Sequence, residues 1–388
     1  VKQELSLQQP LVTAKRIQSI NEQHRSFHAA KDKFNENMTL EEYDHHLGAL
    51  LDGVNDDLKP KSPSSINFED LIIGSSGIEP PTSFDGRERW PGCAKNIGHV
   101  RDQGLCGSCW AQSTVGVFND RLCIASNEEF TEELSTADMT ACDKKNMGCN
   151  GGSPVHASDW LTSDGVVTGG DYPDRNSGTT CYPYPIVDTN SRNHFNEKTV
   201  TPTCRATCSE LKYNREYSKD KYFADGKAYL IGQTNPHMWI SKDLGDPFGI
   251  WNKVKEEIST KGPIIMLYAA TPDHMAYKSG IWDCPAGQAN HGVKCIGYGV
   301  DKTHGNYMTC VNSWNVDFGE QGLFRMKFPG SGCLYALMGL PVKWHGKNQE
   351  SHSSHPGKSE APAPTPPIHR RTKLKVQKKK GFKLNLNY

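Results

Sequence analysis

Long hydrophobic runs are missing from this sequence. No window approaches the roughly 18 apolar residues that a membrane-spanning helix needs, so we predict no membrane span. Net charge is missing too, because 44 basic residues balance 44 acidic ones. The balance is uneven along the chain: residues 345–388 hold ten Lys or Arg and two acids, about +8, which leaves about −8 for the rest. The first residue is Val and no apolar signal-peptide core is visible, so we expect a trimmed chain or a fragment.

Paired Cys-x-x-Cys units, which would indicate a zinc site, are also missing. Only Cys106 and Cys109 have this spacing, and we expect neither a metal nor a cofactor. A thioredoxin-like redox motif has the same spacing, but the flanking Gln103 and Trp110 favour the interpretation given below. Thirteen cysteines are many for a cytosolic enzyme of 388 residues. They indicate disulfides, and the odd count leaves at least one thiol unpaired.

Disulfides favour an oxidising compartment, so we expect the secretory pathway, with a lysosomal or extracellular destination. The single N-glycosylation sequon, Asn37-Met38-Thr39, agrees with this route and marks Asn37 as a glycan acceptor.

The two ends of the chain differ from its middle. Residues 1–80 are polar, hold no cysteine and end in a Ser-, Pro- and Gly-rich linker, 59–81. Apolar spacing predicts helices in this segment near 11–27 and 40–51. Residues 344–388 are Pro-rich and then basic, with too few apolar residues to fold alone, so we predict a disordered tail. Between the ends, 82–208 is rich in Cys and Gly, whereas 209–343 predicts strands, notably at 263–268, 292–299 and 307–312.

The most informative stretch is Gln-Gly-Leu-Cys-Gly-Ser-Cys-Trp, residues 103–110. A cysteine thiolate is a strong nucleophile near neutral pH, so Cys109 is the candidate to attack a carbonyl. A helix is expected to begin near Ser108, an N-cap residue type, and the helix dipole would favour the thiolate. The side-chain amide of Gln103 and the backbone N–H of Cys109 would stabilise the oxyanion that such an attack creates.

A thiol that cleaves an amide needs a base and a group that orients this base. His291 precedes the predicted strand at 292–299, and Asn312 ends the strand at 307–312. A turn between the strands would bring the two side chains together, as a Cys-His-Asn triad requires. Trp314 would shield the His–Asn hydrogen bond from water. Each residue has a plainer explanation, such as a surface His or a solvated Gln, but their order beside the octapeptide favours the triad.

The octapeptide contains the Cys-Gly-Ser-Cys-Trp signature of papain-like cysteine peptidases, and the chain resembles that family over roughly 82–343. Within the family it is similar to the cathepsin B group, because the 182 residues from Cys109 to His291 indicate an insertion. The resemblance implies an α+β fold with a mainly helical lobe (81–208) and a mainly β-barrel lobe (209–343). The active-site cleft would lie between the lobes, and a Cys109 thiolate would form an acyl-enzyme with a protein or peptide substrate.

Further site residues are implied by this resemblance. Gly151 and Gly152 would line the cleft where the substrate backbone passes, and Trp314 and Tyr335 would contact the substrate. Residues 181–208 look like a shortened occluding loop, in which cathepsin B carries a neighbouring histidine pair that binds a C-terminal carboxylate. Here the loop holds one displaced histidine, His194. The disulfides implied are Cys93–Cys123, Cys106–Cys149, Cys142–Cys204 and Cys181–Cys208, while Cys284, Cys295, Cys310 and Cys333 stay unassigned.

The altered loop leaves the type of activity open. We expect an endopeptidase, and a dipeptidyl carboxypeptidase of the cathepsin B type is the alternative. A non-catalytic binding protein on the same scaffold is a third interpretation, but such relatives usually lose the Cys, the His or the Gln, and this chain has all three. The stretch 332–338 has no glutamate, so apolar or aromatic P2 residues are expected to be preferred over Arg.

Both ends of the chain have expected roles. Residues 1–80 resemble a pro-segment in position and length. Such a segment would lie along the cleft against the direction of cleavage, as an inhibitor of its own enzyme, until removal near 80–83. The basic tail would suit an anionic polymer or surface through its charge, and a solvated tail without a partner is the alternative.

Overall fold

The computed structural model describes residues 9–23, 26–51, 79–186, 200–233, 249–285, 287–330 and 335–346. The chain divides into two units, residues 1–349 and 350–388, and the described residues all belong to the first. His194 and Cys333 lie outside the described residues, as does the tail from residue 347. Among the helices of the described residues, none is both long and apolar enough to cross a membrane.

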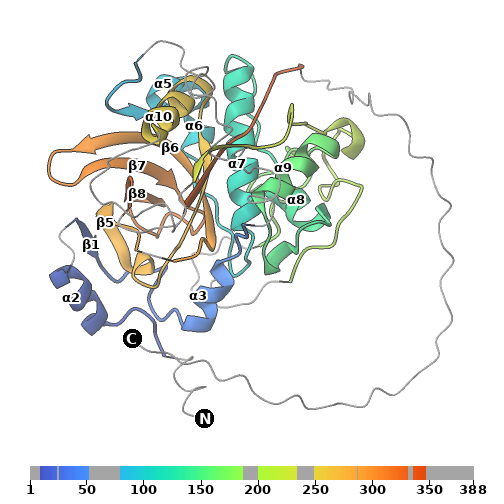
Figure 1. Ribbon diagram of the computed structural model, residues 1–388. Helices are drawn as coiled ribbons and strands as arrows, with labels where there is room; N and C mark the ends of the chain where they lie inside the picture. The colour runs from blue at the N-terminus through green and yellow to red at the C-terminus, as the bar shows by residue number, and fades with distance from the viewer. Residues whose placement is uncertain are drawn as a thin grey trace, which may run out of the picture. The chain divides into compact units, whose positions relative to one another are not determined.

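One long helix, α7 (Cys109–Ala125), lies between the helices and the strands of the first unit (Figure 1). It packs on α8 (Thr136–Cys142) and α9 (Pro154–Ser163) on one side and on the sheet on the other, so nearly all of its side chains are buried. The predicted start at Ser108 is right, but the Ser108 side chain does not cap the helix. Its hydroxyl pairs with the hydroxyl of Tyr184, 2.9 Å away. The shorter helices here are α5 (Gly86–Arg89), η2 (Pro91–Cys93), α6 (Ala94–Ile97), η3 (Gly148–Asn150), η4 (Tyr172–Asp174) and η6 (Tyr217–Lys219).

The strands form one mixed sheet in the order β1-β5-β8-β7-β6-β4-β9-β3, and β2 pairs with β6 beside this path. Strands predicted at 263–268, 292–299 and 307–312 correspond to β4, β6 and β7. The bounds are β1 (Phe27–Ala29), β2 (Phe84–Asp85), β3 (Tyr229–Gln233), β4 (Ile264–Tyr268), β5 (Tyr277–Trp282), β6 (His291–Asp301), β7 (Gly305–Val311), β8 (Leu323–Lys327) and β9 (Tyr335–Gly339). Helix α10 (Ile250–Lys261) precedes β4, and η7 (His274–Ala276) precedes β5.

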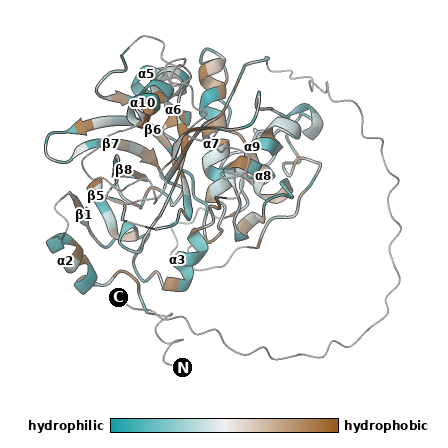
Figure 2. Ribbon diagram, in the orientation of Figure 1, coloured by the Kyte–Doolittle hydropathy of each residue, from teal (hydrophilic) through white to brown (hydrophobic). Residues whose placement is uncertain are grey.

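Apolar side chains on α7 and on the inner strands form the core, as the brown positions in Figure 2 show. The sheet lobe has a largely aromatic core that includes Trp282, Phe318 and Phe324. Where α7 meets the sheet, a buried ion pair joins Asp120 on α7 to Lys294 on β6 at 2.7 Å. Burying both charges together avoids the cost of leaving either one unpaired.

The two helices of the N-terminal segment are shorter than its apolar spacing predicts. Helix α2 spans Ala14–Gln23, and α3 spans Leu40–His46. Phe27, predicted as helical, begins β1 instead, because the edge of β5 offers backbone partners: Phe27 lies opposite Gly280. Helix α3 begins at a capping box of Thr39 and Glu42, and the chain is extended after it.

Five disulfides lie within the described residues, and Cys109 is the free cysteine there. Four of them join the cysteines that the resemblance pairs: Cys93–Cys123, Cys106–Cys149, Cys142–Cys204 and Cys181–Cys208. The fifth, Cys295–Cys310, joins β6 to β7, and Cys284 is disulfide-bonded as well.

Candidate active site

Cys109 is the first residue of α7, where the unpaired N–H groups of a helix end are found. Its thiol is fully buried, and this burial raises the pKa of Cys109 to about 11 against the opposing effect of hydrogen bonds from the backbone N–H groups of Gly292 and Gly48. We expected a thiolate here. The structure instead favours the neutral thiol, because protein covers the sulfur on the side of the cleft.

His291 and Asn312 meet at the ends of two paired strands. His291 is the first residue of β6, and Asn312 follows β7 directly. The His291 Nε2 lies 2.8 Å from the Asn312 Oδ1, and the ring of Trp314 stacks on the imidazole with centroids 4.4 Å apart. Trp314 is fully buried, so it covers this hydrogen bond. Burial lowers the pKa of His291 to about 4, whereas the bond to Asn312 raises it.

The side chain of Gln103 is buried between the start of α7 and the N-terminal segment. Its Nε2 donates to the carbonyl oxygens of Cys106 (2.7 Å) and His46 (3.0 Å). Its Oε1 accepts a hydrogen bond from the Ser313 hydroxyl at 2.6 Å. This bond fixes the orientation of the amide, with Nε2 toward His46. The amide that we expected to bind an oxyanion thus binds the carbonyl of His46. Sequence analysis missed Ser313, although it lies between Asn312 and Trp314.

The N-terminal segment passes beside Gly151 and Gly152. Gly152 donates its N–H to the carbonyl of Gly48 (2.8 Å) and accepts from the N–H of Leu50 (2.9 Å), so the two chains pair in parallel. Gly151 has φ +109°, and a Cβ there would lie 3.0 Å from the Gly48 oxygen. A Cβ at Gly152 would lie 2.7 Å from the Trp110 ring. Gly151 is therefore needed for the backbone of the N-terminal segment to approach this closely, whereas Gly152 is needed for the chain to pack against Trp110.

The structure describes one further predicted contact residue, Tyr335. The ring of Tyr335 packs on Phe328, with centroids 5.1 Å apart, in the core of the sheet lobe, and its role in substrate contact stays a prediction. The next residue, Ala336, belongs to an apolar cluster that also holds Leu267 and Ala49 of the N-terminal segment. His194 lies outside the described residues.

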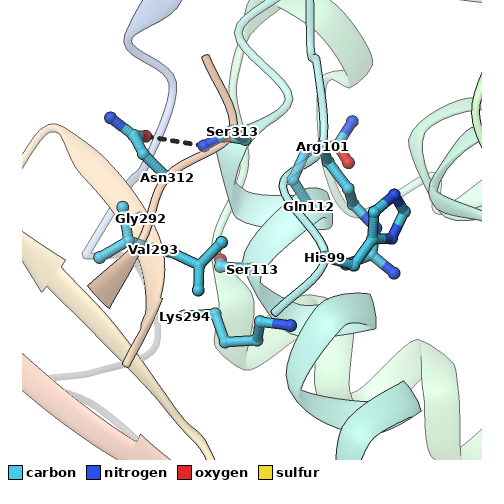
Figure 3. Close-up of a pocket in the computed structure, with 10 residues that line it drawn as sticks. His99, Arg101, Gln112, Ser113, Gly292, Val293, Lys294, Asn312 and Ser313 are labelled. Atoms are coloured by element: carbon cyan, nitrogen blue, oxygen red, sulfur yellow. Dashed lines mark hydrogen bonds between the residues drawn. The ribbon is translucent and has the colours of Figure 1, made fainter. Parts of the chain in front are cut away.

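Behind the His–Asn pair lies a small pocket of about 10 Å³ between α7 and the strands β6 and β7 (Figure 3). Its lining includes Asn312, Ser113 and Lys294, and Figure 3 shows the Oδ1 of Asn312 accepting from the N–H of Ser313 at 2.8 Å. The pocket is about the size of one water molecule, so it offers no room for a substrate. It marks where the two lobes meet.

His99, on the rim of this pocket, is held between two carboxylates. Its ring nitrogens lie 3.2 Å from Glu133 and 2.6 Å from Asp171, and Glu133 also pairs with Arg101 at 2.8 Å. Burial alone would lower the pKa of His99, but the carboxylates raise it to about 9. The imidazolium form is thus favoured near neutral pH, and it joins the loop before the octapeptide to the helical lobe.

A sequence profile described as "Papain family cysteine protease" matches residues 80–336. This chain belongs to the papain family of cysteine proteases. Cathepsin B-like cysteine proteinase 6 of Caenorhabditis elegans is 35% identical over 257 residues, which cover 64% of this chain and 62% of that protein. The match therefore spans less than two thirds of that relative. A cathepsin B-like cysteine proteinase of Schistosoma japonicum is 33% identical over 277 residues, 70% of this chain and 73% of the relative.

Solved structures of the papain family are similar as well. ProCathepsin B S9 from Trypanosoma congolense matches with a TM-score of 0.63 and 25% identity, covering 86% of this chain and all of that one. The digestive procathepsin L 3 of Tenebrio molitor larval midgut matches with a TM-score of 0.57 and 21% identity, covering 84% and 87%. The latter likeness shows the fold alone. The expected α+β two-lobe fold of the papain family is confirmed.

Sequence analysis did not find the residues of the N-terminal segment that occupy the cleft. His46, Gly48 and Ala49 stand in a stretch that carries no motif, and they contact the cleft through backbone atoms. A backbone contact leaves little trace in a single sequence. The one available signal is Gly48 itself, because a glycine within the predicted helix near 40–51 is a common helix end, and α3 does end just before it, at His46.

Proposed function

We propose that this papain-family chain is the zymogen of a cysteine endopeptidase, with residues 1–80 as its pro-segment and 81–343 as its peptidase domain. The observation that carries this proposal is the occupied cleft. The carbonyl of His46 accepts from the Gln103 amide, and the backbone of residues 48–50 pairs with Gly152 next to the buried thiol of Cys109. A segment bound in this way excludes substrate from the thiol.

The proposed reaction begins when this segment has left. The Cys109 thiolate attacks the carbonyl carbon of a peptide bond, and the Gln103 Nε2 and the backbone N–H of Cys109 bind the oxyanion. The His291 imidazolium then protonates the leaving amine, and an acyl-enzyme remains. A water molecule, activated by the neutral imidazole, hydrolyses it. Asn312, bonded to the Nε2 of His291, keeps the other ring nitrogen available for these proton transfers.

Burial gives the zymogen a second safeguard. With the segment bound, burial raises the pKa of the Cys109 thiol to about 11 and lowers that of His291 to about 4, so both groups are neutral at the pH values in between. Departure of the segment lets water reach the cleft and removes the cost of charging both groups. The thiolate–imidazolium pair then forms in the α7 helix dipole.

The test is the activity of the processed chain. We expect hydrolysis of a denatured protein substrate and labelling by an epoxide thiol probe after removal of residues 1–80, both lost in Cys109→Ala. Full activity of Cys109→Ala would reject the proposal. A His291→Ala variant should keep the thiol but label slowly, because its base is missing.

Endopeptidase rather than exopeptidase activity follows from the sequence of the altered loop, which has one histidine, His194. An internally quenched substrate blocked at its carboxyl end should be cleaved as well as its free-carboxyl counterpart. A strong preference for the free carboxyl end would instead favour a dipeptidyl carboxypeptidase. His194→Ala should change neither rate by more than about twofold.

We further propose that the P2 side chain enters an apolar site. Ala49 of the N-terminal segment pairs with Gly152, and its cluster includes Leu267 and Ala336. An apolar site disfavours a charged guanidinium. Phe-Arg substrates should therefore be cleaved at least about tenfold faster than Arg-Arg substrates, compared as kcat/KM, and equal rates would contradict this.

For the cellular route we propose secretion to a lysosomal or extracellular location, supported by the disulfides and by the exposed position of Asn37. Treatment with an N-glycosidase should reduce the apparent mass of the wild-type chain and leave Asn37→Gln unchanged. The basic tail is proposed to bind an anionic polymer through charge. Salt-sensitive retention on heparin that is lost in a chain ending at Trp344 would support this, and equal retention would reject it.

A further inference from the structure

The strands that carry His291 and Asn312 pair in two registers. From Asp301–Gly305 to Gly297–Thr309 the partners on β6 and β7 advance residue for residue. The next pair is Cys295–Cys310, so Ile296 is an extra residue on β6. This is a β-bulge, in which one strand has two residues opposite one of its partner.

The bulge decides which face of β6 each side chain takes. Tyr298, beyond the bulge, and Val293 and Cys295, before it, all belong to the core of the sheet lobe. On β6 the core residues are thus even-numbered beyond the bulge and odd-numbered before it. On β7 the core residues Met308 and Cys310 are even-numbered on both sides. Ile296 packs in a separate cluster with Trp90 and Cys123. A bulge moved by one residue along β6 would therefore change the partners of every residue that it passes.

The Cys295–Cys310 disulfide lies directly beside this bulge, on the side of the His–Asn pair. Both cysteines are fully buried and stand opposite each other in the ladder. Cys310 is two residues before Asn312, and Cys295 is four residues after His291. In the described residues, one further ladder pair, Lys294–Val311, lies between the disulfide and the His–Asn contact.

We propose that the Cys295–Cys310 disulfide locks the register of β7 against β6 and so keeps the Asn312 Oδ1 within hydrogen-bond distance of the His291 Nε2. Strand β6 is also held on its other edge by β4, where Tyr268 lies opposite His291. Strand β7 pairs on its other edge with β8, from Tyr307–Lys327 to Val311–Leu323, and can slip together with it. A covalent bond between two opposed residues forbids such a slip. The two cysteines are positioning residues and contact no substrate.

This proposal rests on the proposed function, because the disulfide would act through the contact between Asn312 and His291. Removing it should loosen the Asn312 contact while leaving the cleft glycines and the Cys109 helix in place. The expected kinetic effect is therefore a fall in kcat with an unchanged KM. A disulfide that served stability alone would lower the melting temperature without this split.

The experiment compares three variants in which disulfides are removed or moved. Cys295→Ala with Cys310→Ala removes the lock, and Cys142→Ala with Cys204→Ala is the control, since it removes a disulfide of the helical lobe outside the cluster that holds Ile296. A third variant adds Val300→Cys and Asn306→Cys to the first, which joins the same strands on the far side of the bulge. Val300 is 56% exposed and lies opposite Asn306, so this change disturbs no core side chain.

We expect the first variant to lose about tenfold in kcat with KM within about twofold, and the control to keep its kcat. The third variant should regain melting temperature but not kcat. Full kcat in the first variant, or recovery of kcat together with melting temperature in the third, would overturn the proposal. If the first variant does not fold, the third decides by the same criterion.

A second measurement separates this proposal from the proposed function. In the full chain, the proton between the His291 Nε2 and the Asn312 Oδ1 should exchange slowly with water by NMR of ¹⁵N-labelled histidine. It should exchange faster in the first and third variants and stay slow in the control. Unchanged exchange in the first variant would overturn the lock even if the enzyme had no activity. Equal activity of wild type and Cys109→Ala would instead reject the proposed function.

Discussion

The N-terminal segment binds the rest of the molecule in two different ways. Its first part, residues 10–23 and 26–43, here called the anchor, is held on the sheet lobe by buried side chains and by the pairing of β1 with β5. Its second part, residues 46–50, here called the cleft segment, is held mainly through backbone atoms. From this contrast we expect two tasks: the anchor would supply most of the affinity, and the cleft segment would block the thiol.

Side-chain contacts of the anchor are specific and buried. The ring of Phe34 stacks on Trp314 (centroids 5.3 Å apart) and meets Phe318 edge-on. The hydroxyl of Tyr43 donates to the carbonyl of Ala270 at 2.8 Å. Since Trp314 also stacks on His291, the anchor binds the aromatic cover of the His–Asn pair.

Contacts of the cleft segment follow the backbone. Gly48 donates to the Asn290 carbonyl at 3.1 Å, and its own carbonyl accepts from Gly152. The carbonyl of Gly107 is so near that a Cβ on Gly48 would lie 2.1 Å from the oxygen. Gly48 is therefore required because a side chain is forbidden there, whereas Ala49 packs in the cluster with Leu267 and the His46 ring meets Trp314 edge-on.

Both parts can be tested by the accessibility of Cys109 in the full chain. The thiol is fully buried, so iodoacetamide reaches it only in molecules in which the segment has left. The labelling rate then follows the population of the open form. A His291→Ala background prevents self-processing under the proposed mechanism and affects all variants equally.

The largest effect is expected from Phe34→Ala. Truncating a buried Phe costs about 3–5 kcal/mol, and each 1.4 kcal/mol is about tenfold, so Cys109 should be labelled at least about 100-fold faster. Lys33→Ala, at the exposed neighbouring residue, is the control and should change the rate by less than twofold. An unchanged rate in Phe34→Ala would show that the anchor is dispensable and that the cleft segment alone closes the site.

Gly48→Ala should have the next largest effect. The added methyl group meets the Gly107 backbone, which cannot rotate away as a side chain would. Overpacking of this kind costs about 1–3 kcal/mol, so labelling should be about 5- to 140-fold faster. The exposed Glu41→Ala is the control. Equal rates in both variants would mean that the cleft segment binds with more freedom than the structure has.

Features that local sequence carries could be predicted, whereas features that depend on contacts with distant parts of the chain could not. The octapeptide and the two strands beginning at His291 and ending before Asn312 carry their chemistry in local sequence, and so predicted the site. Phe27 was predicted as helical because local spacing ignores the free edge of β5. Ser108 was predicted as a cap, but the hydroxyl of Tyr184, 76 residues away, takes its side chain.

Burial was the other property that local sequence did not contain. We predicted a thiolate from the helix start and the nearby imidazole, and the structure has a thiol with a raised pKa. Part of the protein around the sulfur is distant in sequence, since the backbone N–H of Gly48, more than 50 residues before Cys109 in the chain, hydrogen-bonds to it. The four disulfide pairs came from the family resemblance, because spacing alone allows many pairings.

A pH-dependent contribution to the anchor comes from Asp32, with a smaller expected effect. Burial raises the pKa of Asp32 to about 7 against a hydrogen bond from Asn35, and Lys278 at 3.8 Å lowers it only in part. The bound anchor thus prefers the protonated carboxyl. This stabilisation is fully present below the pKa of the free carboxyl, about 4, and is lost as the pH rises to about 7.

Asp32→Asn removes this titration. The ratio of the wild-type labelling rate to that of Asp32→Asn should rise by at least about tenfold between pH 4.5 and pH 7.5. Taking the ratio cancels the titration of the thiol itself. Glu41→Gln, an exposed acid of the same segment, should give a flat ratio. A flat ratio for Asp32→Asn would place its carboxyl in water rather than in the anchor.

The smallest effect is expected where the anchor uses an exposed charge. Arg16 pairs with Asp273 at 2.8 Å, and both side chains are more than a third exposed (37% and 38%). Exposed ion pairs contribute about 0.2–1 kcal/mol and are screened by salt, so Arg16→Ala should raise the labelling rate by at most about fivefold at low salt. At 1 M salt the difference should vanish. Lys15→Ala removes the same charge from the exposed neighbouring residue and should leave the rate unchanged at both salt concentrations. An effect of Arg16→Ala as large as that of Phe34→Ala, or one that persists in salt, would mean that charge and not aromatic packing holds the anchor on the sheet lobe.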